Sequence, residues 1–274
     1  PIYGGGTGPE FENQKQALVK GTDIIICTPG RLMAHLKFNY FDTNSVDYLI
    51  LDEADRMLDM GFYDDIIKIA SKLPKKRQTL LFSATMPPKI RKLAENILIN
   101  PESISLAISK PAAGITQSSY LVHDEQKVRL IREILKNKEK EKPLSHVLIF
   151  ASSIKSVKEI KKTLNRSGFA SSDMHSELNQ DQREETIRDF KNKKIKILVA
   201  TDILSRGIDI KGIELVVNYE VPHDAEDYVH RIGRTARADN TGEAITFINS
   251  KQVRNFMDIE KLIEKSIPKT PLPN

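Results

Sequence analysis

The sequence predicts an α/β fold with parallel sheets in two domains. Short runs of apolar and β-branched residues alternate with segments of helical periodicity, which is the pattern of βαβ units. The alternation lapses once, in the stretch SKPAAG at Ser109–Gly114, and then restarts. Proline and glycine there are typical of a linker. The length of 274 residues suits two domains of about 100–150 residues each.

The first half contains four predicted strands and one predicted helix. The strands are Asp23–Cys27 (DIIIC), Asp47–Leu51 (DYLIL), Gln78–Phe82 (QTLLF) and Ser103–Ala107 (SISLA). The helix is predicted in PPKIRKLAENIL, where two prolines suit the first turn and one face carries Ile90, Leu93, Ala94 and Ile97. We therefore place the first domain at residues 1–108 and the linker at 109–117.

The second half repeats the alternation with more elements. The predicted strands are SYLVH, VLIFA, KILVA, ELVVNY and AITFI. The predicted helices are Gln126–Lys136, Lys155–Asn165, Asp181–Lys191, Ala225–Arg234 and Gln252–Ile263. The mixed-charge run NKEKEKP is predicted to be a solvated loop, and the ending PKTPLPN an unstructured tail. The second domain is placed at residues 118–266 and the tail at 267–274.

Composition narrows the class of protein. With 39% hydrophobic and 29% charged residues, the chain can build cores and does not resemble a disordered protein. The net charge of +5 leans toward polyanionic partners, although many basic proteins bind no nucleic acid. No apolar run reaches the roughly 18 residues of a membrane span. We expect no membrane partner, and the oligomeric state is left open.

The single cysteine and the first residues bear on the cell compartment. Cys27 cannot form an intrachain disulfide, and its apolar surroundings predict a core residue in a reducing cytoplasm. The opening PIYGGGTGPEFE lacks the basic start and apolar stretch of a secretory signal. The chain also lacks a starting Met, so we expect it to begin inside a longer parent protein.

Three carboxylates follow the strand candidate DYLIL, in the sequence LILDEAD. Ligands of parallel α/β sheets sit beyond the carboxyl ends of strands, where Asp52 and Glu53 are expected. Asp52 could hold Mg²⁺ through its water shell, and Glu53 could orient or deprotonate an attacking water in phosphoryl transfer. The tetrapeptide DEAD has a second interpretation, an acidic first turn of a helix.

Other motifs accompany this cluster in a fixed order. Thr28-Pro29-Gly30-Arg31 comes before it, and Ser83-Ala84-Thr85, IFASS, Gln180-Asp181-Gln182-Arg183, ATDILSRGIDI and HRIGRTAR come after it. This ordered set closely resembles the DEAD-box ATP-dependent RNA helicases of superfamily 2, over nearly the whole chain from Gly4 to about Phe247. The resemblance implies two RecA-like domains, the first incomplete, that bind ATP, Mg²⁺ and RNA.

In HRIGRTAR, Arg234 and Arg237 are three residues apart, which places them on one face of a helix. Two planar guanidinium groups suit a γ-phosphate, although a basic surface helix is the other interpretation. The resemblance implies that these residues are the arginine-finger pair and that His230 contacts the DEAD and SAT region. Ala236 stands where the family usually has glycine, a change that we expect function to tolerate.

The resemblance assigns roles to further residues that have ordinary alternatives. It implies that Asp209, in Arg206-Gly207-Ile208-Asp209, bonds the nucleotide ribose and that Gly207 lies at the cofactor; an aspartate in a turn after glycine is the alternative. It implies that Ser83 and Thr85, with Asp55 and Arg206, couple hydrolysis to domain motion. Ser83 and Thr85 could also cap the helix in PPKIRK.

Several loops at the ends of strands and the starts of helices, here called corners, could bind a nucleic-acid backbone. Gly5 and Gly6 allow close approach, the run Thr28–Arg31 opens a helix whose N-terminus favours anions, and Thr201 ends a strand. Gln180 and Arg183 begin another helical stretch. Each alone fits an ordinary βα loop; the resemblance assigns all of them to RNA. His175 is left open as structural or adjacent to RNA, and with 6% aromatic residues and no Trp a stacking platform is not expected.

The phosphate-binding loop Gly-x-x-x-x-Gly-Lys-Ser/Thr is absent from the 274 residues. In the family that loop precedes the Gly-Gly element, so the resemblance implies that this chain starts after it. We expect an ATP-dependent RNA helicase that remodels RNA by ATP-driven domain closure, with this chain alone lacking ATPase activity. The alternative is an inactive RNA-binding or protein-binding fragment; the run DEADRMLDMGF argues against a DNA-directed helicase.

Overall fold

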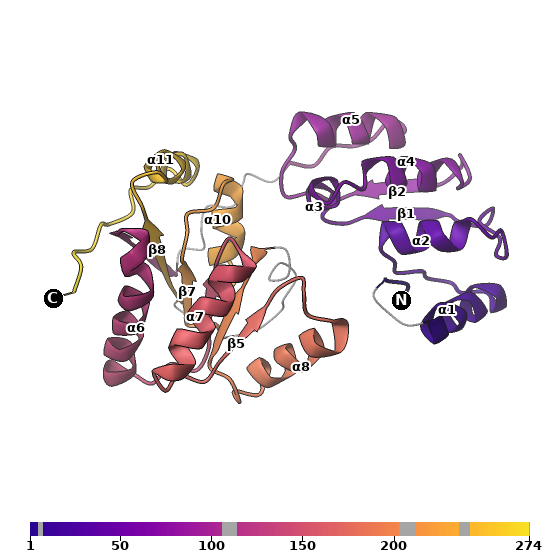
Figure 1. The fold of residues 1–274 in the computed structure, drawn as a ribbon. Coiled ribbons are helices and arrows are strands. Elements are labelled where there is room, and N and C mark those ends of the chain that lie inside the picture. Colours follow the sequence, from indigo (N-terminus) through magenta and orange to yellow (C-terminus); the bar gives the residue numbers. More distant parts are fainter. Residues whose placement is uncertain (5–7, 106–113, 203–211, 236–241, 274) are drawn as a thin grey trace. The chain divides into compact units, whose positions relative to one another are not determined.

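The computed structural model describes residues 1–4, 8–105, 114–202, 212–235 and 242–273 (Figure 1). The chain divides into two compact units, Pro1–Ile108 and Ser109–Asn274. Each unit has its own parallel sheet, and the α/β fold class is confirmed. In the described parts of the chain, no helix has the length and apolar character that crossing a membrane requires.

The first unit has a two-stranded sheet with helices before, between and after its strands. Its elements are α1 (Gly8–Lys20), α2 (Pro29–Leu36), β1 (Tyr48–Leu51), α3 (Ala54–Asp59), α4 (Tyr63–Ser71), β2 (Gln78–Leu81) and α5 (Pro88–Ile97). The strands pair in parallel from Tyr48 opposite Gln78 to Leu51 opposite Leu81. Helices α4 and α5 pack on the sheet through a small core of Leu51, Ile66, Ala70, Leu93 and Ile97.

Two strand predictions for this unit are wrong. In Asp23–Cys27, only Cys27 forms a β-bridge, to Ile2, while the side chains of Ile24 and Ile26 are 77% and 71% exposed. Residues 103–105 of the second run have no strand partner either, and residues 106–107 lie outside the described part. A strand forms only beside a neighbour that accepts its hydrogen bonds, so apolar runs without such a neighbour stay irregular. Cys27 is accordingly half-buried and not a core residue.

The second unit is a six-stranded parallel sheet with helices on both faces. Its elements are β3 (Ile115–Leu121), α6 (Asp124–Glu141), β4 (Val147–Phe150), α7 (Ile154–Arg166), β5 (Ser171–Met174), α8 (Gln180–Lys191), β6 (Ile197–Ala200), β7 (Leu215–Asn218), α10 (Ala225–Ile232), β8 (Gly242–Ile248) and α11 (Val253–Leu262). The strand order is β3-β8-β7-β4-β6-β5. Helices α6 and α7 pack on one face, and α8, α10 and α11 on the other (Figure 1). Burial on both faces explains the continuous apolar runs VLIF, ILVA and LVVN.

The five strands predicted for this unit are present. The predictions of a loop at NKEKEKP and of an unstructured tail at PKTPLPN are wrong. Helix α6 continues to Glu141 through the predicted loop, because Lys138 and Glu139 form ion pairs with Glu243 and Lys196. The tail is also ordered: Ser119 N donates to Pro268 O at 2.8 Å and accepts at its carbonyl from Thr270 N at 2.7 Å. The last residues therefore pair with β3.

Candidate functional site

The first part of the site is a sharp turn at the carboxyl end of β1. Asp52 Oδ1 accepts a hydrogen bond from Glu53 N at 3.0 Å. Glu53 occupies the position before helix α3 in a left-handed conformation, with φ of 50° and ψ of 50°. This conformation is uncommon for residues other than glycine and often marks a functional site. Both carboxylates are exposed beyond the sheet, where the sequence predicted them.

Asp55 joins this turn to the segment after β2. Its Oδ2 accepts from Thr85 N at 3.1 Å and from Thr85 Oγ1 at 3.3 Å, and its own N–H donates to Ser83 Oγ at 3.2 Å. The structure thus brings together three residues predicted to couple hydrolysis to motion. The alternative role of Ser83 and Thr85 as helix caps is wrong, because α5 begins after Pro87 and no side chain caps it.

The carboxylates at the turn fit a hydrated Mg²⁺ ion. Mg²⁺ usually keeps several waters and takes only one or two carboxylates. Asp52 Oδ2 accepts no hydrogen bond from the described residues, so this oxygen is available to water or metal. Glu53 Oε2 accepts from Arg56 Nη1 at 3.1 Å, which holds Glu53 beside Asp52. In the described part of the chain no group of three metal-ligating side chains forms a closed cage, and Asp52 is the residue that best fits such an ion.

The predicted arginine pair does not lie on a continuous helix. Helix α10 ends at Ile232 with Gly233 as its C-cap, so Arg234 lies beyond the helix, and Arg237 lies outside the described residues. The chain leaves the helix because Thr235 forms a parallel β-bridge with Ile213, and Thr235 Oγ1 donates to Ile213 O at 2.5 Å. Arg234 is half-buried within this short exit segment.

Arg231, which the sequence analysis did not single out, anchors the predicted arginine segment. Its Nε and Nη2 donate to both carboxylate oxygens of Asp202 at 2.6 Å, and its Nη1 donates to Asn218 Oδ1 and Glu220 O at 3.1 Å. The guanidinium also lies 5.1 Å from the ring centroid of Phe150. The signal was available, because Arg231 shares the buried helix face with Tyr228 and Ile232.

The corner from Thr28 to Arg31 is a helix N-terminus, as predicted. Thr28 occupies the N-cap position of α2 and its side chain makes no capping hydrogen bond, so the hydroxyl can face a ligand. Pro29 and Gly30 form the first turn. The Arg31 side chain points to α1 instead: its Nε donates to Gln14 Oε1 at 2.8 Å, and its guanidinium lies 4.7 Å from the centroid of the Phe11 ring.

The other predicted RNA contacts that the structure describes lie near the ends of β5 and β6. Gln180 begins α8, and its Nε2 donates to Glu184 Oε1 at 2.8 Å. Arg183 Nη2 donates to Ser176 O at 3.0 Å, and Thr201 N donates to Met174 O at 3.1 Å. Six predicted site residues lie outside the described residues: Gly5, Gly6, Arg206, Gly207, Asp209 and Arg237.

His175 is a buried residue of this unit. Only 2% of it is exposed, and its Nε2 lies 3.4 Å from Asp173 Oδ2. Burial opposes ionisation of Asp173, but the hydrogen bond from Lys161 Nζ at 2.8 Å and the charge of Lys161 prevail and lower the pKa of the carboxyl below its usual value. The burial of His175 favours the structural of the two interpretations.

Two units, each with a parallel sheet and with polar residues after the carboxyl ends of its strands, form the arrangement that the sequence motifs predict. The family model "DEAD/DEAH box helicase" matches residues 2–93, and "Helicase conserved C-terminal domain" matches residues 126–239. The chain belongs to the DEAD-box helicases of superfamily 2.

Relatives and solved structures agree with this assignment. The chain is 39% identical over 274 residues to DEAD-box ATP-dependent RNA helicase 14 of Arabidopsis thaliana. The matched region covers 98% of this chain and 43% of the relative. It is 40% identical to the crystal structure of a DEAD box protein from Methanococcus jannaschii, with a TM-score of 0.54, covering 98% of this chain and 71% of that one. S. cerevisiae Dbp5 bound to RNA and ADP BeF3 is 29% identical with a TM-score of 0.81, covering 90% of this chain and 65% of that one. The chain spans about half the length of the curated relatives it matches.

Proposed function

We propose that the chain contributes the acidic and arginine residues of an ATP-dependent RNA helicase. The observation that carries the proposal is the turn after β1, where Asp52 and Glu53 are exposed and Asp55 bonds Ser83 and Thr85 beside them. The relatives from Arabidopsis thaliana and Geobacillus kaustophilus are ATP-dependent RNA helicases by name, which supports the same activity. The neighbouring structure of Dbp5, bound to RNA and ADP BeF3, supports both ligand classes.

Each residue has a distinct part in the proposed hydrolysis. Asp52 would hold Mg²⁺ through its hydration shell, and the bound ion would neutralise charge on the phosphates. Glu53 accepts a hydrogen bond from the attacking water and orients it. Arg234 and Arg237 stabilise charge on the transferred phosphoryl group, and Asp209 accepts a hydrogen bond from the ribose.

Movement of the two units converts hydrolysis into work on RNA in this proposal. One nucleotide bound by residues of both units favours closure, and its hydrolysis favours release. The contacts of Asp55 with Ser83 and Thr85 transmit the state of the nucleotide site to the segment after β2. RNA is held through its backbone by the Gly5-Gly6, Thr28–Arg31, Gln180–Arg183 and Thr201 corners, independently of sequence.

The phosphate-cradling loop comes, in this proposal, from residues outside these 274. The sequence contains no Gly-x-x-x-x-Gly-Lys-Ser/Thr motif. Tyr48 and Ile50 of β1 are 63% and 58% exposed, and Phe82, directly after β2, is 54% exposed, which favours cover by further residues. This chain alone then hydrolyses ATP poorly, and the full-length product of its gene hydrolyses it.

ATP hydrolysis with and without single-stranded RNA, measured for this chain and for the full-length product, tests the function. RNA-stimulated turnover is expected in the full-length product only. There, Glu53→Gln is expected to lower the rate by about 10²-fold or more and to leave binding of RNA and nucleotide intact. The matched control is Glu95→Gln, an exposed glutamate of α5. RNA binding without turnover in both proteins would favour an inactive RNA-binding chain instead.

A further inference from the structure

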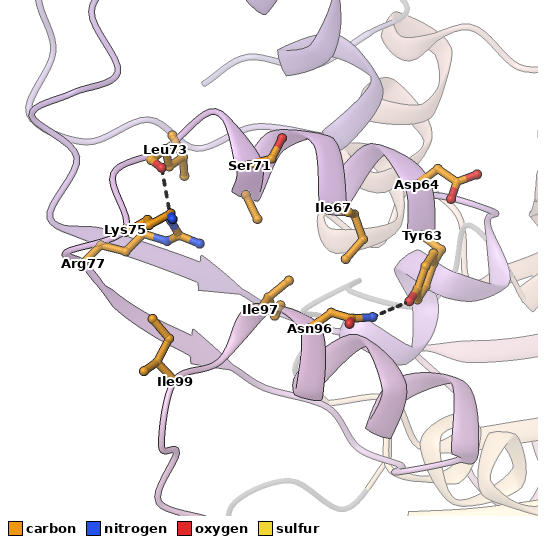
Figure 2. A pocket seen from close by; sticks show the side chains of 11 residues that line it. Tyr63, Asp64, Ile67, Ser71, Leu73, Lys75, Arg77, Asn96, Ile97 and Ile99 are labelled. Atoms are coloured by element: carbon orange, nitrogen blue, oxygen red, sulfur yellow. Dashed lines mark hydrogen bonds between the residues drawn. The ribbon is translucent and has the colours of Figure 1, made fainter.

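A groove of about 620 Å³ lies between α4, α5 and the loop that leads into β2 (Figure 2). Its middle is apolar, lined by Ile67 and Ile97, and Ile99, which is 73% exposed, lies toward the end that carries Arg77 (Figure 2). At one end Asn96 Nδ2 donates to Tyr63 OH at 2.9 Å, which ties the end of α5 to the start of α4. The volume is within the range of binding sites for small molecules or peptide side chains.

The other end of the groove is cationic and partly rigid. Arg77 Nη1 donates to Pro74 O at 2.6 Å and Leu73 O at 3.4 Å, and Arg77 Nε donates to Thr79 Oγ1 at 3.2 Å. These bonds fix the guanidinium, while its Nη2 donates to none of the described residues. Figure 2 shows Lys75 beside Arg77 at this end.

The cations of this end have no acidic partner of their own. Lys75, Lys76 and Arg77 are consecutive, and within the described residues none forms an ion pair. The acidic residue that lines the groove, Asp64, lies at the Tyr63 end (Figure 2). A ligand that fits this surface is therefore apolar in its middle and negatively charged at the Arg77 end.

The groove is separate from the site at the carboxyl ends of the strands. Lys75 and Arg77 precede β2 at its amino end, whereas Ser83 follows the opposite end. The strand between them, from Gln78 to Leu81, spans about 13 Å. A ligand in the groove can therefore stay bound while the residues around Asp52 and Asp55 act.

We propose that this groove is a docking site for an acidic, apolar peptide segment of a protein partner. An aliphatic or aromatic side chain of the segment lies over Ile67 and Ile97, and a carboxylate pairs with the fixed guanidinium of Arg77 and with Lys75. RNA fits the surface less well, because the isoleucine floor offers no partner to phosphate or ribose. The proposal does not depend on the helicase activity.

Selection of random 12-residue peptides displayed on phage tests the proposal. The intact chain is the target, and the Ile67→Glu variant is used to remove peptides that bind elsewhere. Peptides that depend on Ile67 are expected to carry Asp or Glu together with a Leu, Ile or Phe. Affinities of the selected peptides are then measured by fluorescence anisotropy, with circular dichroism confirming that each variant is folded.

Three variants separate the outcomes. Ile67→Glu is expected to weaken binding at least tenfold, Lys75→Glu about three- to tenfold with loss of salt dependence, and the exposed control Lys89→Glu less than twofold. Selection of no Ile67-dependent peptide, or of basic or neutral peptides, overturns the proposal. It is also overturned if Lys75→Glu leaves peptide binding unchanged and instead weakens binding of single-stranded RNA. The Lys75→Glu arm remains informative if Ile67→Glu does not fold.

Discussion

Replacing Arg231 with Met tests whether this buried arginine holds the segment that carries His230 and Arg234. Only 5% of Arg231 is exposed, and its guanidinium makes four hydrogen bonds, two of them to the carboxylate of Asp202 at 2.6 Å. Met fills a similar volume but leaves the amide of Asn218 and the carbonyl of Glu220 without these donors.

The expected loss follows from these contacts. Removing one partner of a buried ion pair costs about 3–5 kcal/mol. The side chain of Asp202 is 32% exposed, so water replaces part of its lost contacts and the lower end of that range applies, about 3 kcal/mol. Arg231→Lys keeps the charge but cannot form the bidentate hydrogen bonds to Asp202, and we expect it to lower the free energy of unfolding by about 2 kcal/mol.

Hydrogen exchange followed by mass spectrometry measures this loss in peptides from β4, β6 and β7, which report on the second unit alone. The matched control is Arg254→Met, an exposed arginine of α11, for which a change within about 0.5 kcal/mol is expected. If Arg231→Met lowers the free energy of unfolding by less than about 1 kcal/mol, Arg231 does not anchor α10 to the sheet.

Three further changes test other contacts. Thr85→Val removes one hydrogen bond to a carboxylate, and urea unfolding of the first unit is expected to show a loss of about 1 kcal/mol. Gly242→Ala places a methyl group 1.9 Å from Thr235 Oγ1, so overpacking is expected to cost about 1–3 kcal/mol in urea unfolding of the second unit, and an unchanged value would contradict the packing. The lowered pKa of Asp173 contributes stability above its ordinary pKa of 3.8 that is lost as the pH falls through the lower folded value. Unfolding measured from pH 6 to pH 2 is expected to show this acid-sensitive contribution, and Lys161→Met is expected to reduce it.

The sequence allowed good prediction of the second unit because its strands are buried on both faces. The runs at β4, β6 and β7 are continuously apolar, which distinguishes them from surface segments. The edge strand β5, Ser171–Met174, has three polar residues out of four and was missed. In the first unit the run Asp23–Cys27 is as apolar as a central strand, but its neighbours decide whether it becomes one.

The site was predictable where neighbouring residues in the sequence are neighbours in space. Asp52 and Glu53 directly follow a strand, so the end of that strand places them. The position of Arg234 was mispredicted because the helix ends at a bridge between Thr235 and Ile213, a contact that spans more than twenty residues and leaves no local signal. The helical spacing of Tyr228, Arg231 and Ile232 indicates that Arg231 faces the core, but its partner Asp202 comes close only after folding.

The pairing of residues 268–270 with β3 determines which truncations and fusions the second unit tolerates at its C-terminus. Ser119 exchanges hydrogen bonds with Pro268 and Thr270, so these residues shield an outer strand that could otherwise recruit strands from other molecules. A truncated protein that ends after α11 is expected to aggregate at concentrations at which the intact chain remains monodisperse. Affinity tags are better joined after Pro273 through a flexible spacer than grafted in place of these residues.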